Sequence, residues 1–280
     1  SYTDPEGRTE TYTYDCNSNL TKTVDKNGNT LKNTYDNQNR LTERTAKEKK
    51  TGKETVHTYR YNAYGDVAVQ DDTQLVYGDV SGQVTKETTK LTKNKDVVKN
   101  YTYDSKGNKS TFSVKAGEDT KLSLSYEYDG SSRLISVKDS EGNRAVSYAY
   151  DTEGSLSERQ AANGLKTTYG YDYQNRLTSM TNETGKGVVS KYSSTYLKNG
   201  QKAEEVSTVM DKNGKSTKKT AAYTYDMLGR ITRETKTGRE DISYTYDANN
   251  NRKQMTIGNK TTAYQYNKND ELLRTDREPL

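Results

Sequence analysis

A tyrosine-led motif recurs along the whole chain, and this recurrence constrains the fold more than any other feature. In "YTYDCNSNLTKTVDKNGNT", residues 12–30, two tyrosines two positions apart precede an aspartate and a small polar run. The second tyrosine, called here the marker tyrosine, returns at intervals from 16 residues (Tyr61 to Tyr77) to 29 residues (Tyr196 to Tyr225). The markers are Tyr14, Tyr35, Tyr61, Tyr77, Tyr103, Tyr128, Tyr150, Tyr171, Tyr196, Tyr225, Tyr246 and Tyr266. Self-similarity at this period is typical of repeat arrays, so the motif is a building unit.

The residues around the markers favour a structural role. Most copies keep the first tyrosine of the pair, at Tyr12, Tyr59, Tyr101, Tyr126, Tyr148, Tyr169, Tyr223, Tyr244 and Tyr264. An aspartate follows the marker at Asp15, Asp36, Asp104, Asp129, Asp151, Asp172, Asp226 and Asp247. Asn62 and Asn267 replace it in two further copies. Asn forms the same turns as Asp, because both side chains hydrogen-bond the backbone two residues on, but Asn cannot act as a base.

A second polar run lies between successive copies, as in "DPEGR" from Asp4, "DKNGN" from Asp25, "DSEGN" from Asp139 and "DKNGK" from Asp211. In the clearest region the two kinds of run alternate about every 10 or 11 residues, the spacing of short strands joined by turns. Tyr, Thr and Val pack well on a pleated surface, and Gly, Asn and Asp form tight reversals. The sequence therefore predicts an all-β protein, an antiparallel meander in which each repeat is a β-hairpin.

Composition limits the kind of core that such a sheet can have. Only 29% of residues are hydrophobic, but 44 basic and 39 acidic residues leave a net charge of +5, too small for charge-driven disorder. The 25 tyrosines supply apolar area, about 150–250 Å² each. We expect a thin, tyrosine-rich sheet with few helices and no thick aliphatic core. The charged insertions Thr45–Glu54 and Thr92–Asp96 are interpreted as exposed loops or hairpin tips.

Candidate chemistry is sparse. His57 is the sole histidine, which excludes multi-histidine metal sites, and we expect it beside the start of a strand. Cys16 lies in a predicted turn and has no second cysteine to pair with. Asp15, Asn17 and Asn19 have alternating oxygens, but Leu20 and Lys26 stand where a calcium loop needs Gly and Glu. No phosphate-binding loop or clustered basic face is found. We expect no enzyme activity, no metal, no cofactor and no nucleic-acid partner.

Recognition of a ligand by the tyrosines is the alternative. Rows of tyrosines could stack on sugar rings, which would make the chain a carbohydrate- or cell-wall-binding adhesion module. Their regular recurrence favours cross-strand aromatic pairs instead, which contribute about 0.2–1 kcal/mol each. Tyr64, Tyr173 and Tyr192 lie outside the paired positions and are the first candidates for exposure.

The repeats resemble the YD-repeat or RHS family. The resemblance covers almost the whole chain and is carried by "YTYDMLGRIT", "YDYQNRLTSM", "YTYDSKGNKS", "YAYDTEGSLS" and "YEYDGSSRLI". The family includes RHS proteins of bacterial competition, the B–C cocoon of insecticidal toxin complexes, teneurins, and wall-associated WapA-type proteins of Gram-positive bacteria. The Lys, Thr and Asn content is most similar to the WapA type. In members of known architecture, strand pairs form a curved spiral sheet that encloses a hollow shell.

The resemblance implies a function as well as a fold. Residues 1–280 would be a single array of about twelve repeats, a fragment of a longer shell without a separate toxin or protease domain. Its partners would be the remaining shell and a C-terminal toxin that it encapsulates or displays to neighbouring cells, as in contact-dependent inhibition. The implied location is secreted, at the bacterial cell wall or cell surface, with no membrane span and with possible self-association at the sheet edges. Leu20, Leu41, Leu134, Leu177 and Ile231, which follow the turns, would hold neighbouring repeats together.

The chain departs from the family pattern at the end of the shell. Bacterial members usually end in an Asp-Pro-x-Gly hallmark followed by a Pro-Asp segment, with aspartates that release the toxin in some members. Here the only Asp-Pro is Asp4-Pro5, and the other proline, Pro279, stands in "REPL". We therefore expect neither the self-cleaving end nor the toxin in this chain.

Overall fold

The computed structural model describes residues 1–79, 81–92 and 95–276, which form 25 strands. No helix occurs within these ranges, and accordingly none that could span a membrane. The prediction of an all-β protein built from antiparallel strand pairs is confirmed. By its internal contacts the chain divides into two compact units, Ser1–Arg133 with Lys138–Asn143, and Leu134–Val137 with Arg144–Leu280.

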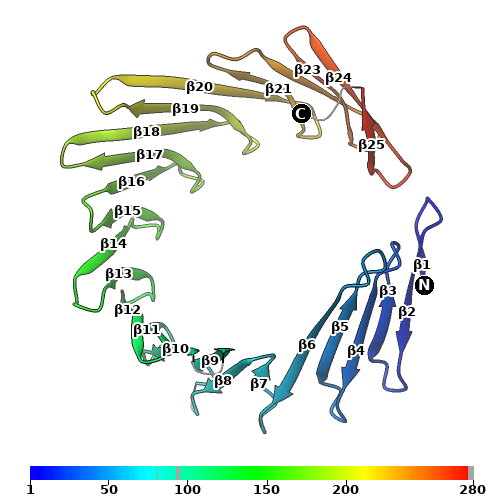
Figure 1. The fold of residues 1–280 in the computed structure, drawn as a ribbon. Helices are drawn as coiled ribbons and strands as arrows, with labels where there is room; N and C mark the ends of the chain where they lie inside the picture. The colour runs from blue at the N-terminus through cyan, green and yellow to red at the C-terminus, as the bar shows by residue number, and fades with distance from the viewer. Residues whose placement is uncertain (80, 93–94, 277–280) are drawn as a thin grey trace. The chain divides into compact units, whose positions relative to one another are not determined.

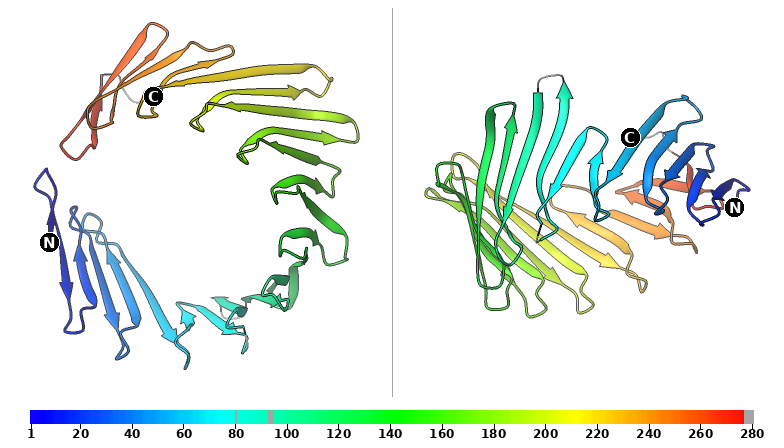
Figure 2. Two further views of the ribbon diagram at one scale, coloured as in Figure 1. Left: turned by 180° about the vertical axis from the view of Figure 1, so that it is seen from behind. Right: turned by 90° about the horizontal axis from the view of Figure 1, so that it is seen from below.

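The first unit contains twelve complete strands in which each strand pairs antiparallel with its neighbours in sequence, and these strands follow one another in a single layer (Figures 1 and 2). They are β1 (Tyr2–Thr3), β2 (Thr9–Tyr14), β3 (Leu20–Val24), β4 (Thr30–Tyr35), β5 (Leu41–Lys47), β6 (Glu54–Tyr61), β7 (Val67–Gln70), β8 (Thr73–Tyr77), β9 (Val84–Thr92), β10 (Lys95–Tyr103), β11 (Lys109–Ala116) and β12 (Asp119–Tyr128). The strand β13 (Leu134–Lys138) follows, at the division between the units.

The second unit repeats the same arrangement, again as one antiparallel layer of strands in sequence order (Figure 1). Its strands are β14 (Arg144–Tyr150), β15 (Leu156–Ala161), β16 (Lys166–Tyr171), β17 (Leu177–Thr184), β18 (Gly187–Tyr196), β19 (Lys202–Met210), β20 (Ser216–Tyr225), β21 (Ile231–Lys236), β22 (Ile242–Tyr246), β23 (Arg252–Ile257), β24 (Lys260–Tyr266) and β25 (Leu272–Thr275).

A single layer leaves little room for an apolar core. Val137 is the one buried hydrophobic residue in the described ranges. The other buried side chains are polar: Asp4, Asn33, Ser136, Thr167, Ser190 and Thr262. The sheet is therefore stabilised mainly by polar contacts and by half-buried rings.

The first charged insertion is an extended hairpin tip, as expected. Strands β5 and β6 pair up to Lys47 and Glu54, and the residues between them form an exposed turn. In the second insertion, Lys93 and Asn94 lie outside the described residues, as does Pro279.

Candidate functional site

The marker tyrosine of each repeat ends a strand and leads into a five-residue reversal, called here the YD turn. At Asp172 the backbone N–H donates to the Arg176 carbonyl (3.0 Å), and the Asn175 N–H donates to the Asp172 carbonyl (2.9 Å). The strand register shifts between Gly170 and Tyr171, so that Tyr171 pairs with Leu177. Asn175 has a φ of 61°. This is the three-residue hairpin loop that closes with a left-handed residue and a bulge.

Both carboxylate oxygens of the aspartate in the YD turn accept hydrogen bonds from residues of the same turn. One Asp172 carboxylate oxygen, Oδ1, accepts the N–H groups of Gln174 and Arg176, both at 3.0 Å. The other, Oδ2, accepts from the Arg176 Nε at 2.7 Å. The Arg176 side-chain bond and the backbone donors hold the pKa of this carboxyl below its usual range. The lowered pKa keeps the group in its charged form, which accepts the hydrogen bonds of the reversal, and makes it a weak base.

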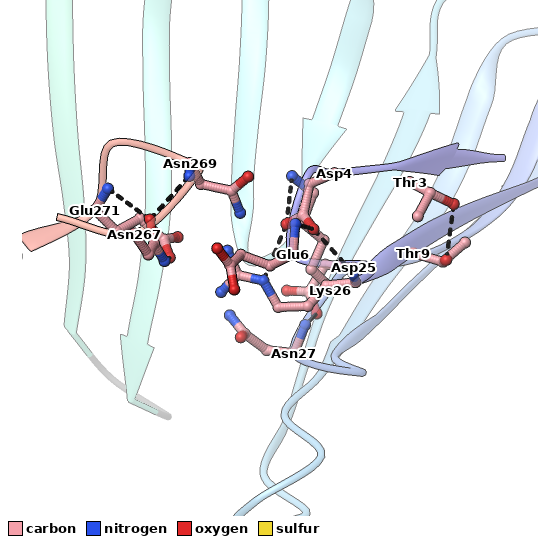
Figure 3. Close-up of polar contacts among 11 residues, drawn as sticks. Thr3, Asp4, Glu6, Thr9, Asp25, Lys26, Asn27, Asn267, Asn269 and Glu271 are labelled. Carbon is pink, nitrogen blue, oxygen red and sulfur yellow. Dashed lines mark hydrogen bonds and ion pairs between the residues drawn. The ribbon is translucent and has the colours of Figure 1, made fainter. Parts of the chain in front are cut away.

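The intervening turns and the Asn-led YD turns share this geometry. Asp4 Oδ1 accepts from the N–H groups of Glu6 (3.0 Å) and Arg8 (2.9 Å), and Lys26 Nζ lies 3.3 Å from Asp4 Oδ2 (Figure 3). Asn267 Oδ1 accepts in the same way from Asn269 (2.9 Å) and Glu271 (3.0 Å) (Figure 3). The amide oxygen of Asn thus takes the place of the carboxylate oxygen, as the sequence suggested.

Asn62 offers a test of this equivalence, because its Oδ1 accepts from Tyr64 N–H (2.9 Å) and Asp66 N–H (3.0 Å). We expect Asn62→Ala to expose both amides and raise their hydrogen-exchange rates at least tenfold, whereas Asn62→Asp should leave them protected. Amide exchange followed by NMR measures this directly. Unchanged rates in Asn62→Ala would show that the side chain does not hold the turn.

The hydroxyl group of the marker tyrosine links one repeat to the preceding one, a contact that the sequence did not reveal. Tyr171 Oη donates to the Leu156 carbonyl (2.9 Å), which belongs to the residue that opens β15, the preceding strand. Equivalent bonds run from Tyr35 to Leu20, Tyr61 to Leu41, Tyr77 to Val67, Tyr103 to Val84, Tyr128 to Lys109, Tyr150 to Leu134, Tyr196 to Leu177, Tyr225 to Lys202, Tyr246 to Ile231 and Tyr266 to Arg252. The residues after the turns therefore join the repeats through their carbonyl groups.

An arginine at the fifth position of a YD turn strengthens the same link. The Arg230 guanidinium bonds to Asp226 Oδ2 (2.7 Å) and lies over the Tyr246 ring, 4.5 Å from its centroid. Arg40 covers Tyr61 at 4.5 Å and Arg176 covers Tyr196 at 4.6 Å in the same manner. The guanidinium group thus connects the carboxylate of one turn to the aromatic ring of the following repeat.

Direct aromatic pairs between neighbouring repeats, which the recurrence had favoured, are replaced by these polar links. Within the described ranges the ring pair in contact is Tyr101–Phe112, with centroids 5.2 Å apart. The reason is geometric. Marker strands alternate with tyrosine-poor strands, so equivalent rings stand two strand spacings apart, about 10 Å, which is too far for ring contact.

Tyr101, a first-position tyrosine, has a distinct environment. Its hydroxyl donates to Glu87 Oε1 (2.8 Å), and Lys99 Nζ lies 2.9 Å from Glu87 Oε2. Burial, followed by the bond to the Glu87 carboxylate, raises the pKa of Tyr101 to about 12. The phenol therefore stays protonated and serves as a hydrogen-bond donor between β9 and β10.

The remaining candidates are dispersed. His57 lies within β6, and its Nδ1 is 2.9 Å from Asp71 Oδ2. Cys16 is exposed in the turn at Asp15. The carboxylate of Asp15 accepts from the N–H groups of Asn17 and Asn19 and from Asn19 Nδ2, so its oxygens are used in the turn. Within the described ranges no group of three or more metal-ligating side chains is found.

The unpaired tyrosines differ in exposure. Tyr64 and Tyr173 are each 93% exposed at the tips of YD turns, whereas Tyr192 is half-buried in β18.

Hydrogen-bonded hairpins closed by Tyr-Asp turns define a YD-type β-repeat array. The chain belongs to the Teneurin YD-shell family, whose model matches residues 2–145 and 198–278. The RHS repeat model matches residues 150–186 between them. The identification of the chain as a YD-repeat protein is thereby confirmed. No curated protein matches the chain.

Solved structures agree with this assignment at the level of the fold. The chain is similar to a crystal structure of TcdB2-TccC3-TEV, with a TM-score of 0.71 and 15% identity over 92% of this chain and 16% of that one. It is also similar to TcdB2-TccC3 without hypervariable C-terminal region, with a TM-score of 0.55 and 12% identity over 94% and 18% of the two chains. The chain thus spans less than one fifth of the length of these structures. Family membership and fold together support a shell-like structural role.

Proposed function

We propose that this chain is a non-enzymatic wall segment of a larger secreted or surface-attached bacterial shell that encloses or displays a C-terminal toxin. The proposal rests on the hydrogen bonds that the side chains of the repeat motif make within the sheet. Marker hydroxyls donate to backbone carbonyls of the preceding repeat, and turn carboxylates accept the N–H groups of their own turns. These side chains hold the wall together. A cargo would therefore be enclosed by the wall and not bound by these groups.

Two further observations support an enclosed or displayed partner. The family that the chain belongs to is named for a shell. One of the similar structures is that of TcdB2-TccC3 without its hypervariable C-terminal region, which is consistent with a constant wall that carries exchangeable segments. The partners that we propose are therefore the adjoining shell repeats and a C-terminal toxin outside these residues, delivered to neighbouring cells from the cell surface.

Protease protection tests this proposal in the natural protein that carries these repeats. We expect the segment after the repeats to resist a non-specific protease for at least ten times longer than the same segment expressed alone. Asp172→Ala, which removes the acceptor of two turn amides, should shorten that protection, and Lys212→Ala at an exposed hairpin tip is the matched control. Equal digestion of the segment in both contexts would contradict enclosure.

Glycan or cell-wall binding is a second candidate because Tyr64 and Tyr173 present exposed rings at turn tips. Binding to purified peptidoglycan that falls at least fivefold in a Tyr64→Ser/Tyr173→Ser variant would favour this function. Equal retention of the variant and the unmodified chain would exclude these two tyrosines as the binding platform.

A further inference from the structure

One YD turn retains groups equivalent to those that bind an arginine in the preceding YD turn, but has no arginine of its own. In the preceding turn, at Asp226, Arg230 Nε bonds to Asp226 Oδ2 (2.7 Å) and Nη1 donates to Asn250 Oδ1 (2.8 Å) on the next YD turn. Its guanidinium group covers the Tyr246 ring at 4.5 Å. A carboxylate, an oxygen of the following turn and an aromatic face thus form a complete guanidinium site within the chain, with the planar geometry that favours arginine over lysine.

The next turn along, at Asp247, carries Asn251 at the position of Arg230. The shorter Asn251 side chain still reaches Asp247 Oδ2 (3.3 Å) and Asp270 Oδ1 (2.6 Å), but it is too short to extend over the Tyr266 ring. No Lys or Arg side chain in the described part of the chain makes a cation–π contact with that ring, whereas Arg252 covers the neighbouring Tyr264 at 4.3 Å.

An open hollow of about 520 Å³ lies at this place, lined in part by Asn251, Tyr264, Tyr266, Asp247 and Asp270. We call it the Tyr266 hollow. Its charge suits a cation, because its lining includes two carboxylates, those of Asp247 and Asp270, and one ammonium group, that of Lys253. The hollow therefore offers an aromatic face and a turn carboxylate, as the Arg230 site does, together with a second carboxylate and space for a side chain from elsewhere.

The second carboxylate distinguishes this turn from the other aspartate-led YD turns that lack arginine. The fifth residue of the turn is Asn19, Asn108 or Ser155 in the turns at Asp15, Asp104 and Asp151, and there it bonds to a neutral group of the next turn. Those groups are Asn39, Ser132 and Asn175. Only at Asn251, among these four described turns, is the next partner an aspartate, Asp270.

We propose that the Tyr266 hollow binds the guanidinium group of an arginine in an extended segment of a partner protein. The incoming group takes the place that Arg230 occupies one repeat earlier: it stacks on Tyr266 and pairs with Asp247 and Asp270. Cation–π contact and charge-assisted hydrogen bonds act together in such a site. This inference goes beyond the construction of a wall, because it assigns the chain a peptide ligand.

The test is a titration of the whole chain, labelled with ¹³C at its tyrosine rings, with the capped peptide acetyl-Gly-Gly-Arg-Gly-Gly-amide. The same peptide with citrulline is the probe control, because citrulline has the shape of arginine without its charge. We expect the arginine peptide to shift the Tyr266 resonance, which is assigned by its loss in Tyr266→Phe. The citrulline peptide should bind at least tenfold more weakly, and raising the salt concentration should weaken binding of the arginine peptide.

Three variants locate the site. Asn251→Arg supplies the missing guanidinium from within and should weaken peptide binding at least tenfold. Asn108→Arg, the same change at the neutral turn, should leave binding unchanged. Lys253→Glu alters no turn hydrogen bond and should strengthen binding at least threefold, which keeps the test valid if Asn251→Arg does not fold. Equal binding of both peptides, or binding insensitive to Asn251→Arg and Lys253→Glu, would overturn the proposal. A shift of Tyr266 by N-acetylglucosamine oligomers but not by the arginine peptide would replace it with glycan binding.

Discussion

Replacing Tyr171 by Ala is expected to lower the free energy of unfolding by about 2–3 kcal/mol. This loss lies below the roughly 3–5 kcal/mol typical of a fully buried aromatic residue, because the Tyr171 ring is half-buried. Part of the loss comes from its hydroxyl, which donates to the Leu156 carbonyl at 2.9 Å. Because this bond joins one marker to the residue that follows the preceding YD turn, its removal weakens the link between neighbouring repeats.

Urea denaturation of the purified chain measures this loss. Tyr171→Phe keeps the ring and removes only the hydroxyl bond, so it should cost about 1 kcal/mol. Tyr64→Ala is the exposed control, since Tyr64 is 93% exposed, and should change stability by less than about 0.5 kcal/mol. Equal, small losses in Tyr171→Ala and Tyr64→Ala would mean that the marker rings do not hold the repeats together.

The strand pattern could be predicted because it depends on local sequence. Alternating Tyr and Thr indicates a strand, and an Asp followed by small polar residues indicates a reversal, so the all-β antiparallel fold was accessible from residues such as Tyr169, Tyr171 and Asp172. The exchange of Asp for Asn at Asn62 also identified the turn role, because only the acceptor oxygen is common to both side chains.

The links between repeats could not be predicted, because they depend on register. Tyr171 Oη reaches the Leu156 carbonyl across the pairing of β15 and β16, and neither the register of that pairing nor the register shift beside Tyr171 can be read from the local motif. The contact of Arg176 with Asp172 lies within one turn and can be predicted from their spacing in the sequence. The stacking of Arg176 on Tyr196 cannot, because it depends on where the next marker tyrosine lies in space. The same limit hid the Tyr266 hollow, which arises from one Asn and one Asp on successive turns.

Acidification should destabilise the folded chain, and this is expected to be the largest effect of solution conditions because many turns respond in the same direction. Turn aspartates with a lowered pKa are Asp15, Asp25, Asp36, Asp104, Asp129, Asp172 and Asp226. For Asp15, Asp36, Asp104 and Asp172 the largest cause is the bond from the side chain at the fifth position of the turn, and for Asp129 and Asp226 it is the backbone N–H there. In Asp25, burial opposes the hydrogen bonds but does not outweigh them.

The direction of the pH effect on stability follows from the linkage between proton binding and folding. Each carboxyl group has a lower pKa in the folded chain than in the unfolded chain, so the unfolded state takes up protons first. The stabilisation is complete above the ordinary aspartate pKa, near 4, and is lost as the pH falls through the lower values of the folded state. We therefore expect the urea midpoint to be level near pH 6 and to fall steeply between about pH 4 and 2.

An Asp172→Asn variant separates charge from turn geometry. As at Asn62, the amide oxygen can still accept the two backbone N–H groups, but the ion pair with Arg176 is lost. The variant should be less stable than the unmodified chain at pH 6 and should lose less stability on acidification, so the two curves converge at low pH. Parallel curves would show that Asp172 does not contribute to the pH dependence, and a midpoint that stays constant down to pH 2 would contradict the role of the turn carboxylates altogether. Because these carboxylates recur along the array, such an acid response would loosen the wall at many turns at once.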